Sequence, residues 1–312
     1  MADIRKVATR QSYGEALVEL GAAHDDFVVL DADLAAATQT GKFKAAYPDR
    51  FIDVGIAEQN LMGVAAGIAT TGRKVFASTF AMFAAGRAFE QVRNSIGYPH
   101  LHVVIGATHA GMSVGEDGAT HQCNEDLALM RTIPGMTVIV PADDVEAKAA
   151  VRAAYEAEGP VYLRLGRLPV PVILKDDYRF EVGRGVVERE GSDVTVIACG
   201  LEVPAALEAA KTLADKGMSC EVINMATIKP LDGDLIVASA RKTGRVVTVE
   251  EHSVIGGLGS AVCDLLCEAC PTPVKKIGVN DVFGESGPAL DLLAKYGLDG
   301  AGVAEAIEGF VR

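Results

Sequence analysis

Residues 101–122 read LHVVIGATHAGMSVGEDGATHQ, and this stretch joins the two patterns that indicate the fold. Its beginning, LHVVIGA (101–107), is rich in Val and Ile, as expected of a buried strand. The remainder, Thr108 to Gln122, is polar and rich in glycine, with two histidines and two carboxylates. A long polar loop after a buried strand is more typical of a functional site than of a spacer.

Similar short apolar runs occur on both sides of this stretch. We predict further buried strands at FVVLDADL (27–34), FIDVG (51–55), VFAS (75–78), MTVIVPA (136–142) and VYLRL (161–165). Amphipathic helical patterns lie between most of them, such as AEQNLMGVAAGIAT (57–70) and DDVEAKAAVRAAYEAEG (143–159). Alternation of strands and helices predicts an α/β fold, in which a mostly parallel sheet is covered by helices on both faces.

The stretch RLPVPVILKDDYRFEVG (167–183) interrupts this alternation, and its prolines and charges are typical of a linker. A second, smaller α/β unit follows. Its expected elements are strands at 192–200, 218–225 and 244–252, a helix over 203–216 and a closing helix near the C-terminus. We therefore predict two domains, residues 1–180 and residues 181–312.

The composition excludes several classes of partner. The chain has 312 residues, of which 49% are hydrophobic, and a formal net charge of −13. Such an acidic chain repels nucleic acid and anionic membranes. Its start lacks the apolar core of a secretory signal, and no apolar run is long enough to span a membrane. The six cysteines show no disulfide-framework spacing, so we expect a reduced, cytoplasmic protein.

Two motif-like patterns are interpreted as structural. Cys263, Cys267 and Cys270 have the CxxxCxxC spacing of some iron–sulfur sites, but they read as the body of an apolar helix. The run Gly256–Gly259 lacks the full GxGxxG pattern of a dinucleotide site. We therefore expect neither a metal cluster nor a dinucleotide here.

Ligands of open α/β sheets bind beyond the carboxyl ends of the strands. Glu58 follows the expected strand 51–55 and opens a helix, where it either complements the helix dipole or presents a carboxylate to a ligand. Phe80 and Phe83 follow the expected strand 75–78. Their spacing fits a helix packed into the core, and also an aromatic wall for a planar ring.

The polar loop offers His109, Asp117 and His121. Their side chains suit either a metal site or hydrogen bonding and proton transfer to a polyhydroxylated substrate, and spacing does not separate these alternatives. Arg10 precedes the first helix, and Arg164 and Arg167 flank the end of the strand at 161–165. An arginine at such an edge either binds a phosphate or is a solvated surface charge.

Four strings occur in an order and at a spacing that resemble one known family over nearly the whole chain. They are DVGIAEQN (53–60), STFAMFAAGRAFEQVRNS (78–95), GEDGATHQ (115–122) and RTIPGMTVIVPAD (131–143). The chain resembles the transketolase family, with its pyrimidine-binding domain followed by its C-terminal domain.

The resemblance implies thiamine diphosphate as the cofactor. Glu58 matches the glutamate that bonds a ring nitrogen of the aminopyrimidine and so favours its imino tautomer. Phe83 matches the aromatic residue that stacks on this ring, with Phe80 beside it, and Asp33 matches a carboxylate near the cofactor. The protein would set the tautomer and orientation, while the carbanion chemistry belongs to the cofactor.

The resemblance also implies a substrate end. Asp117 and His121 match catalytic residues that contact the hydroxyl and carbonyl end of a sugar, whereas Arg10, His109 and Arg167 match the group that binds its terminal phosphate. Ala37 departs from the pattern, because many transketolases have a phosphate-binding Ser there, and the adjacent Thr38 is a candidate to replace it.

The chain lacks the Gly-Asp-Gly motif that, in this family, holds Mg²⁺ and the cofactor's diphosphate. The resemblance therefore implies that another polypeptide, an N-terminal transketolase subunit, supplies that domain and the metal. Two copies of each chain would assemble with the cofactor at the interface, and this chain would also self-associate through apolar contacts.

We therefore expect a subunit of a transketolase that transfers a two-carbon ketol unit between sugar phosphates. The alternatives are a subunit like 1-deoxyxylulose-5-phosphate synthase, the β subunit of a 2-oxo acid dehydrogenase, or a non-catalytic scaffold subunit. The loop from His109 to His121 favours a sugar over a 2-oxo acid. Glu58 and Phe83 at their matching places favour an enzyme over a scaffold.

Overall fold

The computed structural model describes residues 5–312, and a seven-stranded sheet forms the centre of its N-terminal half. The strand order is β12 (Thr227–Lys229), β6 (Thr137–Ile139), β7 (Val161–Arg164), β5 (Val103–Thr108), β4 (Lys74–Phe80), β2 (Phe27–Asp31) and β3 (Phe51–Asp53). All neighbours are parallel except β12, which runs antiparallel to β6. The carboxyl ends of β2, β4, β5 and β7 therefore share one edge.

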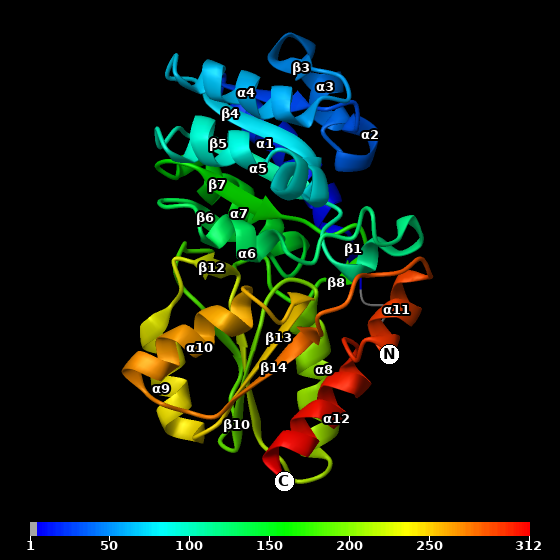
Figure 1. The fold of residues 1–312 in the computed structure, drawn as a ribbon, viewed down its shortest axis with the longest axis vertical. Coiled ribbons are helices and arrows are strands. Elements are labelled where there is room, and N and C mark those ends of the chain that lie inside the picture. Colours follow the sequence, from blue (N-terminus) through cyan, green and yellow to red (C-terminus); the bar gives the residue numbers. More distant parts are fainter. Residues whose placement is uncertain (1–4) are drawn as a thin grey trace.

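Helices cover both faces of this sheet (Figure 1). One face packs against α1 (Thr9–Ala23), α3 (Gly41–Ala46) and α7 (Asp144–Glu156) around a core that includes Tyr13, Phe27 and Phe76. The other face packs against α4 (Glu58–Ala69), the helical segment η2 (Met82–Arg87), α5 (Phe89–Gln91) and η3 (Val92–Gly97), and α6 (Asp126–Arg131). The short segments α2 (Ala35–Thr38), η1 (Pro48–Arg50) and η4 (Met112–Asp117) lie in the connections.

The C-terminal half contains a five-stranded sheet. Its order is β14 (Val274–Val279), β13 (Val246–Ser253), β10 (Val194–Ala198), β11 (Cys220–Asn224) and β9 (Val186–Arg189), and only β9 is antiparallel to its neighbour. Helices α8 (Glu202–Ala214) and α12 (Gly300–Val311) cover one face, and α9 (Gly233–Thr243) and α10 (Leu258–Ala269) cover the other (Figure 1). The short helix α11 (Ala289–Lys295) packs against η4. The predicted fold class, with mostly parallel sheets, is confirmed.

The two halves are closely joined. Strand β12 adds to the N-terminal sheet, and one apolar cluster continues from that sheet into the C-terminal half. The predicted linker contains β8 (Val170–Pro171), which pairs with β1 (Lys6–Val7). The Asp143 carboxylate also accepts N–H bonds from Ile173 and Leu174, both at 2.8 Å. The linker is thus bound along the N-terminus of α7, while the domain boundary at residue 180 stays a prediction.

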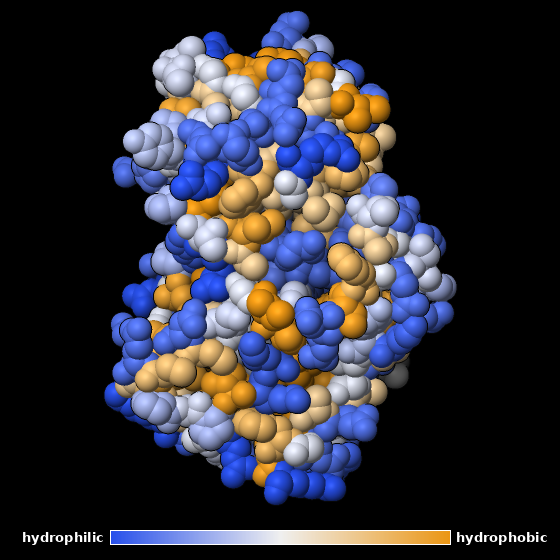
Figure 2. Space-filling model, in the orientation of Figure 1, coloured by the Kyte–Doolittle hydropathy of each residue, from blue (hydrophilic) through white to orange (hydrophobic). Residues whose placement is uncertain are grey.

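One predicted strand differs in its surroundings. Residues 51–55 were expected to be buried, but β3 lies at the sheet edge, where Ile52 is 37% and Ile56 is 78% exposed. An apolar sequence favours burial, but the burying surface can belong to the same chain or to another one. Within residues 5–312, no further strand pairs with the outer edge of β3. On the face drawn in Figure 2, hydrophobic side chains form separate patches among hydrophilic ones.

Cys263 and Cys267 lie on α10, as predicted, and Cys270 follows its last residue. Their side chains are less buried than the prediction of packed hydrophobes implies. Cys267 is exposed, and Cys263 and Cys270 are half-buried. No helix within residues 5–312 is both long and apolar enough to cross a membrane.

Candidate active site

His109 lies at the carboxyl end of β5, where the polar loop begins. Its backbone is left-handed, with φ of 57°, a strained conformation for a non-glycine residue that is enriched at functional sites. The imidazole stacks on Phe80 from the neighbouring strand β4, with ring centroids 3.8 Å apart and planes at 25°. Parallel strands thus bring the two predicted residues together at one edge.

The hydrogen bonds of His109 fix its tautomer. Arg10 can only donate, so its N–H donates to Nε2 at 3.2 Å, and Nδ1–H donates to the Thr108 hydroxyl at 2.9 Å. Burial, with Arg10, Arg167 and His121 nearby, lowers the pKa of His109 to about 3. His109 is therefore neutral at physiological pH and serves as a polar wall of the site rather than as a cation.

Phe80 and Phe83 form an aromatic wall. Their rings are nearly parallel, at 16° with centroids 5.7 Å apart, and His121 meets both edge-on, at 6.1 and 5.4 Å. Phe80 is buried, as the core alternative predicted, whereas Phe83 is half-buried. One ring therefore anchors the wall and the other remains partly available for stacking.

Glu58 opens α4 and lies close to this wall. Only 3% of the residue is exposed, and its carboxylate accepts a hydrogen bond from Arg87 at 2.9 Å. The Arg87 guanidinium also lies over the Phe83 ring, 4.5 Å from its centroid. A wide helical turn at η2, in which the Ala88 N–H donates to the Phe83 carbonyl at 3.1 Å, carries both of these side chains.

Arg10 and Arg167 form the basic side of the site. Arg10 donates to the Ala37 carbonyl at 2.8 Å, and its burial, with Arg167 nearby, lowers its pKa. Arg167 donates to the Val114 carbonyl and pairs with Glu116 at 3.2 Å and Asp117 at 3.9 Å. Both arginines line an open cleft of ≈ 590 Å³ together with Gln39, Ser113 and Pro288.

The structure therefore gathers most of the predicted site residues. Contacts connect Arg10, His109, His121, Phe80 and Phe83, and Glu58 joins this group through Arg87. Arg167, which pairs with Asp117, lines the same cleft as Arg10. Asp33 is exposed beside the edge strand, where its N–H donates to the Asp53 carboxylate at 3.0 Å.

Two residues considered as phosphate ligands lie outside the cleft of Arg10 and Arg167. Arg164 is buried and pairs with Asp126 at 2.8 Å, so it is not a solvated charge either. Thr38 cannot replace the missing Ser at Ala37, because its buried hydroxyl donates to the Asp31 carboxylate at 2.7 Å. At position 37, the backbone carbonyl takes part in the site by accepting an N–H of Arg10.

Sequence reasoning missed Arg87 and Ser113. Arg87 lies four residues after Phe83, a spacing at which side chains of one helix contact each other, and this spacing was the signal that could have found it. Ser113 had no such signal, because its place in the cleft depends on how the loop folds back.

Comparisons with known proteins cover both halves. Residues 5–172 match the family described as "Transketolase, pyrimidine binding domain", and residues 183–303 match "Transketolase, C-terminal domain". The chain is 50% identical over 301 residues to a putative transketolase C-terminal section from Methanocaldococcus jannaschii, covering 96% of this chain and 94% of that protein.

Solved structures give the same relationship. A split gene transketolase, described as an inactive beta4 tetramer, is 58% identical with a TM-score of 0.91, and the match covers 97% of this chain and 98% of that one. A transketolase from Pichia stipitis in complex with sedoheptulose-7-phosphate is 26% identical with a TM-score of 0.84. That match covers 99% of this chain but 46% of the Pichia chain.

Proposed function

The chain belongs to the transketolase family, and from this premise we propose that it is one subunit of a split transketolase that transfers a two-carbon ketol unit between sugar phosphates. The proposal rests on one site with three adjoining parts: the buried Glu58 carboxylate, the aromatic wall and the basic cleft. This order suits a planar cofactor ring at one end and a phosphorylated sugar at the other.

The proposed partner is an N-terminal transketolase subunit that carries the diphosphate-binding domain and Mg²⁺. Two observations support it. The match covers 98% of the chain of a split gene transketolase, and the apolar residues Ile52 and Ile56, near Glu58 in the chain, are exposed. We propose a cytoplasmic heterotetramer with two copies of each chain, acting in pentose phosphate metabolism.

The residues present fit the pyrimidine ring of thiamine diphosphate. The guanidinium of Arg87 is planar, donates an N–H to Glu58 and lies over Phe83, so this place accepts a flat group with N–H donors. Glu58, Phe83, Phe80 and Asp33 would hold the cofactor. When bound, thiamine diphosphate supplies the nucleophilic carbon that carries the two-carbon unit.

The chain's own residues then have distinct tasks. Glu58, shielded from water, would hold a hydrogen bond at a ring nitrogen after Arg87 moves aside. His121 and Asp117 would contact the hydroxyl and carbonyl end of the sugar. Arg10 and Arg167 would bind the terminal phosphate through charged N–H donors, with neutral His109 between them and the aromatic wall.

The basic cleft also bears on the alternatives. Two arginines that line one cleft favour a phosphorylated substrate over a 2-oxo acid, because the phosphate carries more negative charge and more acceptor oxygens. The cleft does not separate a transketolase from a subunit like 1-deoxyxylulose-5-phosphate synthase, so that alternative stays open.

Turnover of a ketose phosphate with an aldose phosphate acceptor tests the proposal. The assay contains thiamine diphosphate and Mg²⁺ with this chain alone, the candidate partner alone, or both. We expect turnover only in the mixture. Turnover by this chain alone would contradict the need for a partner, and no turnover in the mixture with any sugar phosphate would contradict the proposed reaction.

A further inference from the structure

The loop that carries the basic cleft is held by the C-terminal half of the molecule. At its base, the Gly111 N–H donates to the Cys123 carbonyl at 2.9 Å. Strand β13 binds next to this base, where the Ser253 N–H donates to the Asn124 carbonyl at 2.7 Å. The side chain of Glu251, also from β13, reaches into the loop and accepts the backbone N–H of Ser113.

Glu251 is closely enclosed. Only 4% of the residue is exposed, and a Cβ atom added at Gly111 would overlap with the carboxyl carbon of Glu251. Gly111 also has a φ of 78°, which favours glycine. The loop backbone is thus shaped around this carboxyl group from two sides.

The contact continues directly into the cleft. Ser113, whose N–H donates to Glu251, lines the cleft, and the carbonyl of the following residue, Val114, accepts an N–H of Arg167. The backbone of these two residues therefore joins two hydrogen bonds, one to Glu251 and one to Arg167. This connection leads from the C-terminal sheet to a proposed phosphate ligand.

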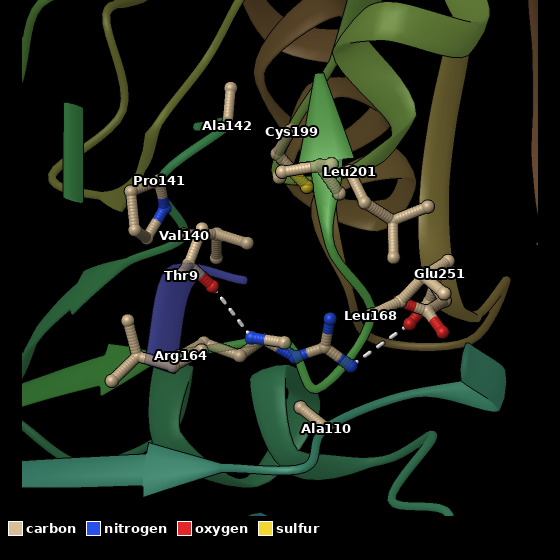
Figure 3. A pocket seen from close by; sticks show the side chains of 14 residues that line it. Thr9, Ala110, Val140, Pro141, Ala142, Arg164, Leu168, Cys199, Leu201 and Glu251 are labelled. Carbon is tan, nitrogen blue, oxygen red and sulfur yellow. Dashed lines mark hydrogen bonds between the residues drawn. The ribbon is translucent and has the colours of Figure 1, made fainter. Parts of the chain in front are cut away.

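The surroundings of Glu251 are fixed as well. Figure 3 shows Glu251 beside Arg164, whose N–H donates to the Glu251 backbone carbonyl at 2.9 Å, while its Nε–H donates to Asp126. Burial raises the pKa of Glu251 to about 7, against the opposing effects of Arg164 and the Ser113 bonds. Glu202, which is fully buried, lies near enough for the two carboxyl groups to repel each other.

We propose that Glu251 is a positioning residue for substrate binding: through the Ser113–Val114 backbone it fixes the loop and Arg167, and so couples the docked C-terminal half to the phosphate end of the cleft. The identity of the anion rests on the proposed function, but the coupling does not. Glu251 itself lies behind the loop and acts only through it.

Kinetics of the reconstituted enzyme test this role. Glu251→Ala leaves the Ser113 N–H without its acceptor, and we expect KM for the sugar phosphate to rise about tenfold, the cost of one charge-assisted hydrogen bond, with a smaller change in kcat. Glu251→Gln keeps an acceptor oxygen of similar size and should restore KM to near the wild-type value. An unchanged KM in Glu251→Ala would overturn the proposal.

Glu250→Ala is the matched control. Glu250 is the preceding residue, is equally buried, and faces the opposite side of β13, where it accepts the N–H groups of Leu258 and Gly259 at 2.7 and 2.8 Å. Its loss weakens the start of α10 without touching the loop. We expect lower thermal stability and an unchanged KM. An equal rise of KM in both variants would show a general loss of stability and would overturn the proposal.

Hydrogen–deuterium exchange of the full chain alone gives a readout without catalysis. We expect faster exchange over residues 111–122 in Glu251→Ala, and no such change in Glu250→Ala. Unchanged exchange in that segment would overturn the coupling whatever the kinetics show. Faster exchange together with a complete absence of sugar phosphate turnover would instead support the coupling and contradict the proposed function.

Discussion

The basic cleft and the face around Glu58 belong to one site but differ in how far this chain completes them. In the cleft, Arg10 and Arg167 are held by the carbonyls of Ala37 and Val114. His109, beside Arg10, is held by the Thr108 hydroxyl. The cleft is therefore organised before any ligand arrives.

The face around Glu58 is incomplete by comparison. Its carboxylate is bound by the chain's own Arg87, and Ile52 and Ile56 of the same edge are exposed. A buried carboxylate needs a partner, and Arg87 provides it in the isolated chain. We therefore propose that this chain supplies most of the substrate site, whereas a second polypeptide completes the cofactor face.

The largest expected effect is on the cofactor face. Glu58→Gln in the assembled enzyme should lower kcat by about 10²–10⁴-fold, because the amide cannot exchange a proton with the ring nitrogen. Turnover measured beside size-exclusion chromatography checks this, since the oligomeric state should not change. Wild-type turnover in this variant would remove Glu58 from the mechanism.

A smaller effect is expected in the cleft. Arg167→Ala should raise KM for a sugar phosphate about 10–100-fold, the cost of a charged hydrogen bond, and leave KM for an unphosphorylated ketose almost unchanged. Arg152→Ala, an exposed arginine on α7 whose pair with Glu19 spans 3.8 Å, is the control. An equal loss with both ketoses would mean that Arg167 does not bind the phosphate.

Arg87 tests whether the chain's own side chain competes with the cofactor. Its side chain is 50% exposed, so water screens its ion pair with the buried Glu58, and we assign the pair about 1 kcal/mol, as for exposed pairs. Arg87→Ala should therefore tighten binding of thiamine diphosphate by the assembled enzyme up to about fivefold, as measured by titration calorimetry. Arg93→Ala, which removes an exposed arginine of η3, is the control and should leave binding unchanged. Weaker binding by Arg87→Ala would show that Arg87 helps to hold the ring instead.

A further effect, on stability rather than on activity, concerns pH. Burial, Arg10, Arg167 and His121 lower the pKa of His109 to about 3, so the unfolded chain binds the proton more readily than the folded one. His109 thus makes stability fall as pH decreases from about 6.5 towards 3. Thermal unfolding of wild type and His109→Asn should diverge below pH 6.5, with the wild type losing more. Parallel curves would contradict this.

The sequence predicts the cleft better than the cofactor face. Strand ends in a parallel sheet share an edge, so the strand pattern alone places His109, Phe80 and Arg167 near one another. In the fold, His109 stacks on Phe80 and lies close enough to Arg167 for its charge to lower the pKa of His109. The exposure of β3 could not be predicted, since an apolar strand has the same pattern whether its own chain or a partner covers it.

Contacts between distant residues account for the other differences. Arg164 pairs with Asp126, and Glu251 holds Ser113, 138 positions away in the chain. Neither contact leaves a periodic or local signal, because each depends on how the two halves of the chain pack. The contact between Glu251 and Ser113 is also the one that we propose positions the cleft.

Binding of thiamine diphosphate, with Mg²⁺ present, shows whether the cofactor site needs a second polypeptide. Titration calorimetry compares this chain alone, the candidate partner alone and the equimolar mixture. We expect strong binding by the mixture and no measurable binding by this chain alone, because we propose that the partner completes the cofactor face. Strong binding by this chain alone would mean that it contains a complete cofactor site and needs no partner for it.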